Sequence, residues 1–479
     1  MAQLNFATKT VRTPVFTAEG APAARVNKAD QLRRLLNACM LWEDNFYSDG
    51  QSVADRMREL VREVPAEKCA ELAVKAREEQ KLRHAPLLIV YEMTLASKQH
   101  RLLVGETLAR VIQRPDEITE FVAIYWKLNG KKTPLSKQVK KGLSAAFNKF
   151  SEYQLAKYNR DKDIKLADVL ALCHAKPKDK ETGLLFAKLA NKDHLPKKTK
   201  SAQFPVANTY RALNKDFVGL QTPDTWEVAL SAGADKKATW ERLITEDKLG
   251  GLAMIRNLRN MQEAGVSDSV IKQGLGQMNA ERVLPFRFIA AAKYGPKFEA
   301  HLEAAMFKCL EGHGKLKGKT VLLVDVSGSM DAPVSRKSDL QRVDAGAALA
   351  MLLREVCEDV VIYTFSDREA LIPTRRGFAL AEAIVKSQPH SGTYLGRSAS
   401  AVATREYDAD RVIVITDEQS HDHVGNPFAA TRAKAYMLNV ANERNGVGYK
   451  NGWTHIDGWS ESCVDYIVAE ESFKGSSRD

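Results

Sequence analysis

Apolar residues recur every three to four positions between Asn27 and Glu311, which is the spacing of one face of an α-helix. Asn27 is a good helix cap and precedes a predicted helix through Ala38, in which three leucines share a stripe. Further helices are predicted at the spacing of helix pairs, over residues 52–64, 66–79, 84–96 and 100–113. A pair takes about 30 to 45 residues, within the range of helical solenoids. This region is therefore predicted to be a helical-repeat array.

The pattern changes after Thr320, where short runs of branched apolar residues alternate with helical segments. Such continuous apolar runs suit strands that are buried on both faces of a parallel sheet. The predicted strands cover residues 321–324, 360–365, 412–415 and 435–440, and the predicted helices cover residues 340–357, 378–386, 395–406 and 429–434. Strands and helices in alternation predict a doubly wound α/β, Rossmann-like domain.

These patterns divide the chain of 479 residues, which is long enough for several domains, into four parts. Residues 1–26 show no sustained period and are predicted to be an N-terminal arm. The helical array takes residues 27–311 and the α/β domain residues 320–479. A Gly- and Lys-rich stretch, residues 312–319, is predicted to link them.

Composition narrows the class of protein. Apolar and charged residues occur at ordinary globular frequencies, which argues against a disordered or fibrous chain. No apolar run has the length of a membrane span and the N-terminus lacks the core of an export signal, so we expect a cytoplasmic protein without membrane contact. The six cysteines are far apart and form no CxxC pair, so reduced thiols are expected and neither a zinc site nor disulfides. A monomer is the default expectation.

Positive charge is concentrated in one segment. Residues 131–200 contain 17 Lys and one Arg against seven Asp and Glu, a balance of +11 that equals the net charge of the whole chain. Concentrated positive charge is typical of a protein that binds a polyanion, most often nucleic acid. The alternative is a lysine-rich surface that only serves solubility.

Within this segment Lys137, Lys140 and Lys141 are three and four positions apart, so they share one helix face, opposite an apolar stripe. Further candidates for an RNA-binding surface follow along the chain: Lys157, Arg160, His174 and Lys176. Lysines at this spacing also commonly form a solvated face, and a histidine after an apolar helix is commonly a helix cap.

A candidate metal site follows the first strand of the α/β domain. Asp325, Ser327 and Ser329 are spaced two apart directly after the strand, so one carboxylate and two hydroxyls can converge. Thr393, in a short polar loop, and Asp417, at the end of a later strand, complete a set of oxygen donors. Hard oxygen donors of this kind suit Mg²⁺ (or Mn²⁺), and ligand sites lie at the carboxyl ends of parallel strands. The alternative is a polar turn without a metal.

The DxSxS motif with the later Thr and Asp resembles the metal-ion-dependent adhesion site (MIDAS) of von Willebrand factor A domains. A basic helical array followed by such a domain resembles the Ro ribonucleoprotein family, which carries the TROVE module. The stretches that carry this resemblance are KYNR (157–160), LCHAKP (172–177), RNL (256–258), RVLPF (282–286) and DVSGSM (325–330).

The resemblance implies that HEAT-like repeats form a ring and that the protein handles RNA. It implies a small structured Y-type noncoding RNA on the outer basic surface, and single-stranded 3′ ends of misfolded RNAs in the hole of the ring. It places Lys140, Lys141, Lys157 and His174 at positions tied to RNA binding. It further implies RNA quality control, with a nuclease as a conceivable protein partner.

Two other classes of function compete with this interpretation. An enzyme would use Ser327 or Ser329 as a nucleophile, but the chain lacks GxSxG and a recognisable paired histidine, so catalysis is not expected. A metal-dependent protein-interaction adaptor, with the helical array as its scaffold, is the stronger rival. RNA affinity that falls steeply with salt would separate RNA binding from the adaptor function.

Overall fold

The computed structural model describes residues 15–38, 50–130, 133–159, 163–194, 220–221, 223–280, 283, 285–310, 315–333, 340–441, 445–449 and 451–458, and positions 463, 466, 467 and 471. The described residues separate into two compact units. One unit contains the described residues of Met1–Arg34 and of Gly314–Trp459. The other unit contains the described residues of Leu35–His313 and of Ser460–Asp479. This division differs from the predicted one, because the N-terminal residues belong with the α/β domain.

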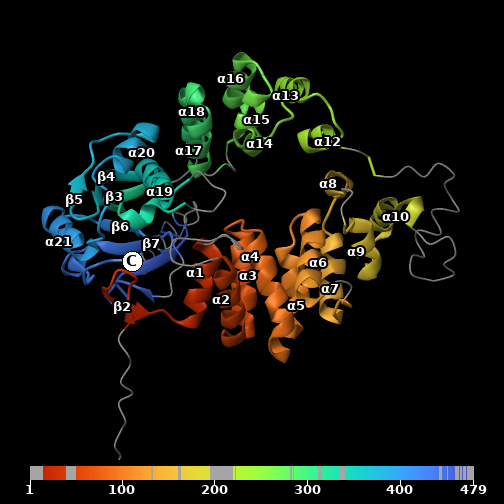
Figure 1. Cartoon of the computed structure of the whole chain (residues 1–479), viewed down its shortest axis with the longest axis horizontal. Coiled ribbons are helices and arrows are strands. Elements are labelled where there is room, and N and C mark those ends of the chain that lie inside the picture. The colour runs from red at the N-terminus through yellow and green to blue at the C-terminus, as the bar shows by residue number, and fades with distance from the viewer. Residues whose placement is uncertain are drawn as a thin grey trace, which may run out of the picture. The chain divides into compact units, whose positions relative to one another are not determined.

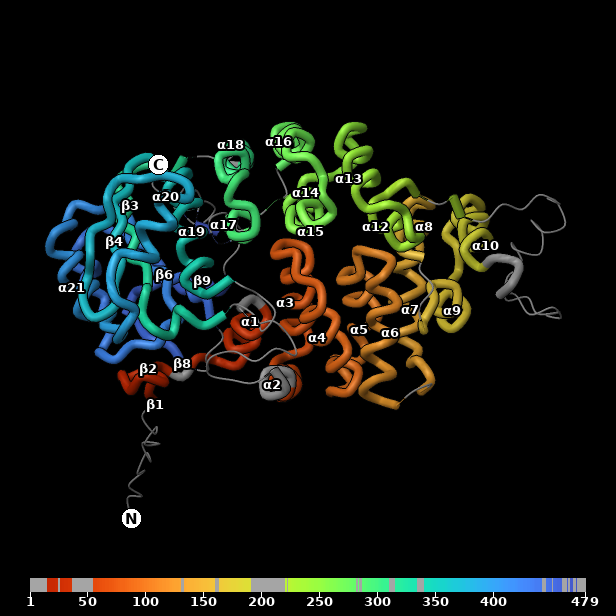
Figure 2. Tube along the Cα trace, turned by 45° about the horizontal axis from the view of Figure 1, so that its top comes forward, coloured from red at the N-terminus to blue at the C-terminus, as the bar shows by residue number. Residues whose placement is uncertain are grey.

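The helical unit consists of antiparallel helices that pack on their neighbours along the chain (Figures 1 and 2). Its first group is α1 (Lys28–Ala38), which begins in the other unit, α2 (Gly50–Glu63), α3 (Ala66–Glu78), α4 (His84–Leu95), α5 (Lys98–Val111), α6 (Pro115–Asn129), α7 (Lys137–Phe147), α8 (Glu152–Tyr158), α9 (Leu166–Leu172) and α10 (Lys180–His194). Its second group is α12 (Trp226–Ser231), α13 (Lys236–Thr245), α14 (Gly251–Arg256), α15 (Leu258–Glu263), α16 (Asp268–Gln277), α17 (Pro285–Tyr294), the 3-10 turn η1 (Pro296–Phe298) and α18 (Glu299–Leu310).

Helix α5 packs against α3 and against α7 in this array. The contact between α5 and α7 is close because each helix has a glycine there, Gly105 and Gly142. A Cβ atom at Gly142 would lie 2.8 Å from the carbonyl oxygen of Gly105 and 2.8 Å from the Cβ of Leu108. The missing side chains therefore let the two backbones approach, which fixes where α7 presents its polar face.

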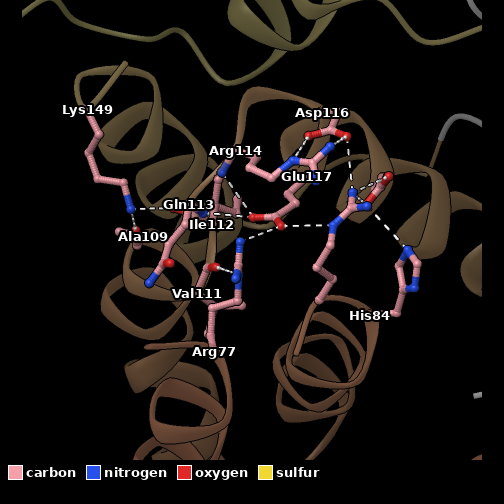
Figure 3. Close-up of polar contacts among 12 residues, drawn as sticks. Arg77, His84, Ala109, Val111, Ile112, Gln113, Arg114, Asp116, Glu117 and Lys149 are labelled. Carbon is pink, nitrogen blue, oxygen red and sulfur yellow. Dashed lines mark hydrogen bonds and ion pairs between the residues drawn. The ribbon is translucent and has the colours of Figure 1, made fainter. Parts of the chain in front are cut away.

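A buried ion-pair network ties the first helices together (Figure 3). Glu117, in the first turn of α6, is fully buried and accepts hydrogen bonds from Arg77 of α3 at 2.7 Å and from Arg83 at 3.3 Å. Its second carboxylate oxygen accepts from the backbone N–H groups of Gln113 at 2.8 Å and Arg114 at 3.1 Å. Because a buried charge needs compensating partners, this carboxylate holds α3, the residue before α4 and the start of α6 in fixed positions relative to one another.

The α/β unit has a six-stranded sheet in the order β5-β4-β3-β6-β7-β9, parallel except for β5. Its elements are β3 (Leu316–Asp325), η2 (Gly328–Asp331), α19 (Arg342–Val356), β4 (Cys357–Phe365), β5 (Glu369–Leu371), α20 (Gly377–Val385), α21 (Leu395–Arg405), β6 (Arg411–Thr416), η3 (Pro427–Ala430), β7 (Lys434–Asn439) and β9 (Thr454–Asp457). The predicted fold class, a helical array followed by a doubly wound α/β domain, is confirmed.

Helices cover both faces of this sheet, which is why its strands are apolar throughout (Figure 1). Val321 and Leu323 of β3 pack with α21, while Val324 faces α19 beside Ile415 of β6. One predicted helix is wrong: residues 429–434 hold the end of the short turn η3 and the start of β7. Strand β7 begins at Lys434 because that residue pairs with Arg411 at the start of β6.

The N-terminal residues form structure that the sequence pattern did not predict. Strands β1 (Val15–Phe16) and β2 (Pro22–Arg25) make a small antiparallel hairpin, and β2 also pairs with β8 (Asn445–Gly446). Strands of two to four residues are too short to show periodicity, so the hairpin left no signal in the sequence.

Candidate metal centre and candidate RNA interface

The strand register brings the two candidate metal-binding aspartates to neighbouring strand ends. Strands β3 and β6 are parallel neighbours with Val324 opposite Ile415, so Asp325 and Asp417 follow at the same edge of the sheet. The chain passes from β3 to β4 on one side and returns to β6 on the other, so β3 and β6 flank a topological switch point. In open α/β sheets ligands bind outside the carboxyl ends of strands at this point.

The loop after β3 turns its polar groups inward. Asp325 accepts hydrogen bonds from the backbone N–H of Ser327 at 2.9 Å and from the hydroxyl of Thr416 at 2.6 Å. The hydroxyl oxygens of Ser327 and Ser329 lie 3.4 Å apart. Asp325 and Ser327 have no exposed surface, and Ser329 is buried. The loop therefore presents one carboxylate and two hydroxyls in a dry environment, where a bound cation would be weakly screened.

Two buried carboxylates repel one another here. Burial, reinforced by the charge of Asp417, raises the pKa of Asp325 to about 7. Burial also raises the pKa of Asp417, although the guanidinium of Arg342 opposes this rise. Nη1 of Arg342 lies 3.3 Å from the Asp417 carboxylate and is itself buried. The site thus holds more negative charge than its protein surroundings compensate, which favours binding of a cation.

Thr393 comes from a third loop, which contacts the first. The backbone N–H of Gly328 donates to the carbonyl of Ser391 at 3.0 Å, so the loops after β3 and before α21 are in contact. The backbone of Thr393 is held by His421: its N–H donates to Nδ1 at 3.0 Å and its carbonyl accepts from the His421 N–H at 2.7 Å. Thr393 is buried, at 2% exposure.

The five predicted metal ligands therefore come from three adjoining loops at one sheet edge. In the described parts of the chain, no three His, Cys, Asp or Glu side chains gather as a metal cluster. The donor set is instead two carboxylates and three hydroxyls, which fits a hard divalent cation that keeps some of its water. Sequence reasoning missed Arg342 and His421, because their partners are 75 and 28 residues away in the chain.

The predicted lysine face lies on α7. Lys137 and Lys141 are exposed and Lys140 is half-buried, on the side of the helix that also carries Ser144 and Asn148. Val139, Leu143, Ala146 and Phe147 of the same helix are fully buried, as the predicted apolar stripe requires. Ser136 caps the helix, its hydroxyl accepting from the Val139 N–H at 3.3 Å.

The segment after α9 packs beside this face. The backbone N–H of Lys176 donates to the Ser144 hydroxyl at 3.2 Å, and the Asn148 amide donates to the carbonyl of Lys176 at 2.9 Å. His174 and Lys176 are exposed, and His174 has a left-handed backbone with φ 51°. Helices α7 and α9 also contact directly (Figure 1). We define this combined surface as the α7–α9 basic face: Lys137, Lys140, Lys141, His174 and Lys176.

No ammonium group of the α7–α9 basic face forms an ion pair with a described residue, whereas other lysines of the basic segment are engaged. Lys149 donates to the carbonyls of Ala109 and Ile112, and burial lowers its pKa. Lys188 pairs with Glu152 at 2.8 Å. Four unpaired lysines on one face leave a concentrated positive potential for an anionic partner.

The structure gives a different picture for the two remaining predicted RNA-binding residues, Lys157 and Arg160. Lys157, near the end of α8, lies 3.5 Å from Glu227 of α12, and α8 packs on α6 and α10. The Oε2 atom of Glu227 is buried and has no hydrogen-bond partner within the described ranges. Arg160 lies outside the described residues.

Other sequence expectations concern cysteines and membranes. The five described cysteines are buried, and Cys39 lies outside the described residues. Burial raises the pKa of the Cys69 and Cys173 thiols to about 12. Among the helices that the structure describes, none is long and apolar enough to cross a membrane.

A helical array with a von Willebrand-type α/β domain, whose DxSxS loop lies at the sheet's switch point, defines the class of this protein. Comparison with known families specifies it further. The model of the TROVE domain matches residues 207–316, and the model of the Ro60 vWA domain matches residues 319–442. Over these two stretches the chain is similar to proteins that carry a TROVE domain and a Ro60 vWA domain.

Individual proteins are similar to this chain in their fold or over a short stretch of sequence. The crystal structure of the Deinococcus radiodurans Ro (RSR) protein superposes with a TM-score of 0.57 at 18% identity, covering 91% of this chain and 97% of that one. Mouse and rat telomerase protein component 1 are 37% and 36% identical over 91 residues. That match covers 18% of this chain and 4% of each telomerase component. The α7–α9 basic face lies outside both matched family models.

Proposed function

We propose that this protein binds RNA without catalysing its turnover and that the α7–α9 basic face is the docking surface for a structured RNA of the Y type. The observation that carries the proposal is the group of four lysines that have no acidic partner among the described residues, beside exposed His174. Lysine-rich surfaces recognise RNA duplexes through shape and phosphates, with little base reading. We further propose that the helical array accepts single-stranded 3′ ends of misfolded RNAs, as the Ro resemblance implies.

The test is the salt dependence of RNA binding. A Lys137→Gln/Lys140→Gln/Lys141→Gln variant should bind a structured RNA more weakly and with a smaller log–log salt slope. Each lost phosphate contact should remove roughly 0.7 to 0.9 from that slope. A matched control is Lys236→Gln/Lys237→Gln/Lys272→Gln, which removes the same charge from exposed lysines of α13 and α16. Equal losses in both variants would show that only net charge counts and would contradict the docking surface.

We also propose that Asp325, Ser327, Ser329, Thr393 and Asp417 hold one Mg²⁺, directly or through water, with a position left for an acidic group of a protein partner such as a nuclease. Bound Mg²⁺ would supply an electrophilic centre for that carboxylate. The compensating cation would favour the ionised form of Asp325, whose pKa is raised to about 7 by burial. Mg²⁺ affinity should therefore fall as the pH is lowered from 7 to 5.

Calorimetric titration of the full chain with Mg²⁺ tests the metal site. Asp325→Ala should abolish uptake while RNA binding persists, because the α7–α9 basic face belongs to the other compact unit. Unchanged metal stoichiometry in that variant would rule out this ligand set. The metal-dependent adaptor alone, without RNA binding, would be favoured if the wild-type protein bound Mg²⁺ but no RNA at any salt concentration.

A further inference from the structure

The loop that carries Asp417 is framed by the N-terminal segment of the same compact unit. Each of the four residues after Asp417 contacts a residue between Thr17 and Arg34. The pairs are Glu418 with Arg34 at 2.5 Å, the Gln419 side chain with the Ala18 N–H at 2.7 Å, the Ser420 carbonyl with the Thr17 hydroxyl at 2.7 Å, and His421 with Glu19 at 3.1 Å. These contacts span about 400 residues of sequence.

The first of these contacts sustains an unusual backbone. Glu418 has φ 59°, in the left-handed region that side chains other than glycine rarely adopt. Its carboxylate is fully buried between the guanidinium of Arg34 and Nδ1 of His455, at 2.5 and 2.9 Å. Such a conformation persists only where surrounding contacts hold it. Arg34 thus helps to fix the chain direction immediately after Asp417.

The last contact reaches a second metal ligand. Nδ1 of His421 accepts from the backbone N–H of Thr393, so the ring proton is on the other nitrogen, Nε2. Nε2 lies 3.1 Å from the Glu19 carboxylate. The ring is also stacked on Tyr394, with 5.3 Å between the ring centroids. Glu19 therefore stabilises the tautomer and the orientation with which His421 holds Thr393.

We propose that the N-terminal hairpin supplies the outer shell of the metal centre and that Glu19 is a positioning residue, acting on Thr393 through His421. The proposal rests on the metal site proposed above. Partners that orient metal ligands through hydrogen bonds typically contribute 10- to 100-fold in metal affinity. The structure assigns this task to a strand-turn-strand segment at the opposite end of the sequence from the ligands.

The experiment is calorimetric titration of the full chain with Mg²⁺, together with ¹⁵N spectra of the histidine rings. Glu19→Ala should weaken Mg²⁺ binding about 10-fold or more, and the His421 ring should lose its single Nε2-protonated tautomer. Glu19→Gln keeps an oxygen that accepts from Nε2 and should restore most of the affinity. The His421 signals are identified by their loss in His421→Gln.

Glu382→Gln is the matched control, because it removes one exposed carboxylate, paired with Lys386 on α20 of the same unit, and should leave the affinity unchanged. Equal weakening by Glu19→Gln and Glu19→Ala would reduce the effect of Glu19 to charge and overturn the positioning role. If Asp325→Ala abolished Mg²⁺ uptake but Glu19→Ala left the Mg²⁺ affinity unchanged, the positioning role of Glu19 would be overturned and the metal site would stand. If the wild-type chain took up no Mg²⁺, the metal site and this inference would both fail.

Discussion

Arg342 is the residue whose charge would compete most directly with a metal ion at the proposed site. It lies 3.3 Å from the buried carboxylate of Asp417, so it compensates that charge when no cation is bound. Arg342→Met should cost the metal-free protein up to about 3 kcal/mol of unfolding free energy, since it leaves a buried charge without its partner. Mg²⁺ would replace the lost positive charge, so added Mg²⁺ should stabilise this variant more than the wild type.

Urea denaturation in EDTA and in Mg²⁺ measures this difference. Arg342→Lys, which keeps the charge, is the control and should respond to Mg²⁺ as the wild type does. An identical loss of stability in Arg342→Met with and without Mg²⁺ would mean that Arg342 only packs against the loop and does not substitute for the ion.

Lys157 is the predicted RNA-binding residue for which the structure raises a specific doubt. Its ammonium group is paired with Glu227, so RNA must break that pair before Lys157 can contact a phosphate. Partly exposed pairs of this kind contribute about 0 to 1 kcal/mol. Glu227→Gln should therefore strengthen RNA binding up to about fivefold, and Lys157→Gln should weaken it. RNA titrations of both variants and of the double variant decide the matter: unchanged affinity in all three would make Lys157 a structural residue.

Among the elements, long periodic segments were predictable and short ones were not. The strands that become β3, β4, β6 and β7 are apolar because helices cover both faces of the sheet, and that burial is visible in composition alone. Chain order then places Asp325 and Asp417 at adjacent strand ends, so the closeness of these two loops could be predicted from the sequence. Their surroundings could not, because Arg342, His421 and the hairpin act through contacts between residues far apart in the chain.

In the helical unit, too, the basic segment could be predicted from the sequence only as far as local spacing determines it. Lys137, Lys140 and Lys141 could be grouped because a single helix sets their spacing. Whether Lys157 joins them depends on how α8 packs, which is decided by tertiary contacts that no local pattern encodes. Counting charges located the segment rich in lysine, but it could not distinguish a lysine without an acidic partner from one held by Glu227.

The close contact between α5 and α7 leads to a prediction about stability. Gly142→Ala would place a Cβ atom 2.8 Å from backbone and side-chain atoms of α5, so the helices would have to separate. Overpacking costs about 1–3 kcal/mol, of which higher helix propensity returns up to about 1 kcal/mol. Urea denaturation should show a net loss. The control is Gly276→Ala in α16, where nothing lies within 4 Å of the added atom and propensity alone should stabilise. Equal effects would contradict close packing at Gly142.

At the scale of the whole molecule, the charge distribution separates two tasks. The net positive charge of the chain is contained in residues 131–200, whereas the candidate metal centre lies in the α/β unit, and the remainder of the chain is electrically balanced. The proposed neutralisation of RNA phosphates and the proposed metal binding would therefore depend on different residues. This separation is consistent with the proposal that one unit docks an RNA while the other holds a metal ion for a protein partner.

Such a molecule should bind RNA and leave it intact. A two-metal nuclease needs carboxylates that hold two ions about 4 Å apart, whereas the described donor set offers Asp325 and Asp417 with three hydroxyls. We therefore expect the purified protein with Mg²⁺ to retain RNAs that carry a single-stranded 3′ end and to leave their length unchanged.

Blunt-ended duplexes should compete poorly for that mode of binding, because a channel suited to one strand does not admit two. Labelled RNA incubated with protein and Mg²⁺ and resolved on a denaturing gel gives the answer. Shortened products that disappear with Asp325→Ala would show that the metal centre cleaves RNA and that the protein is an enzyme after all.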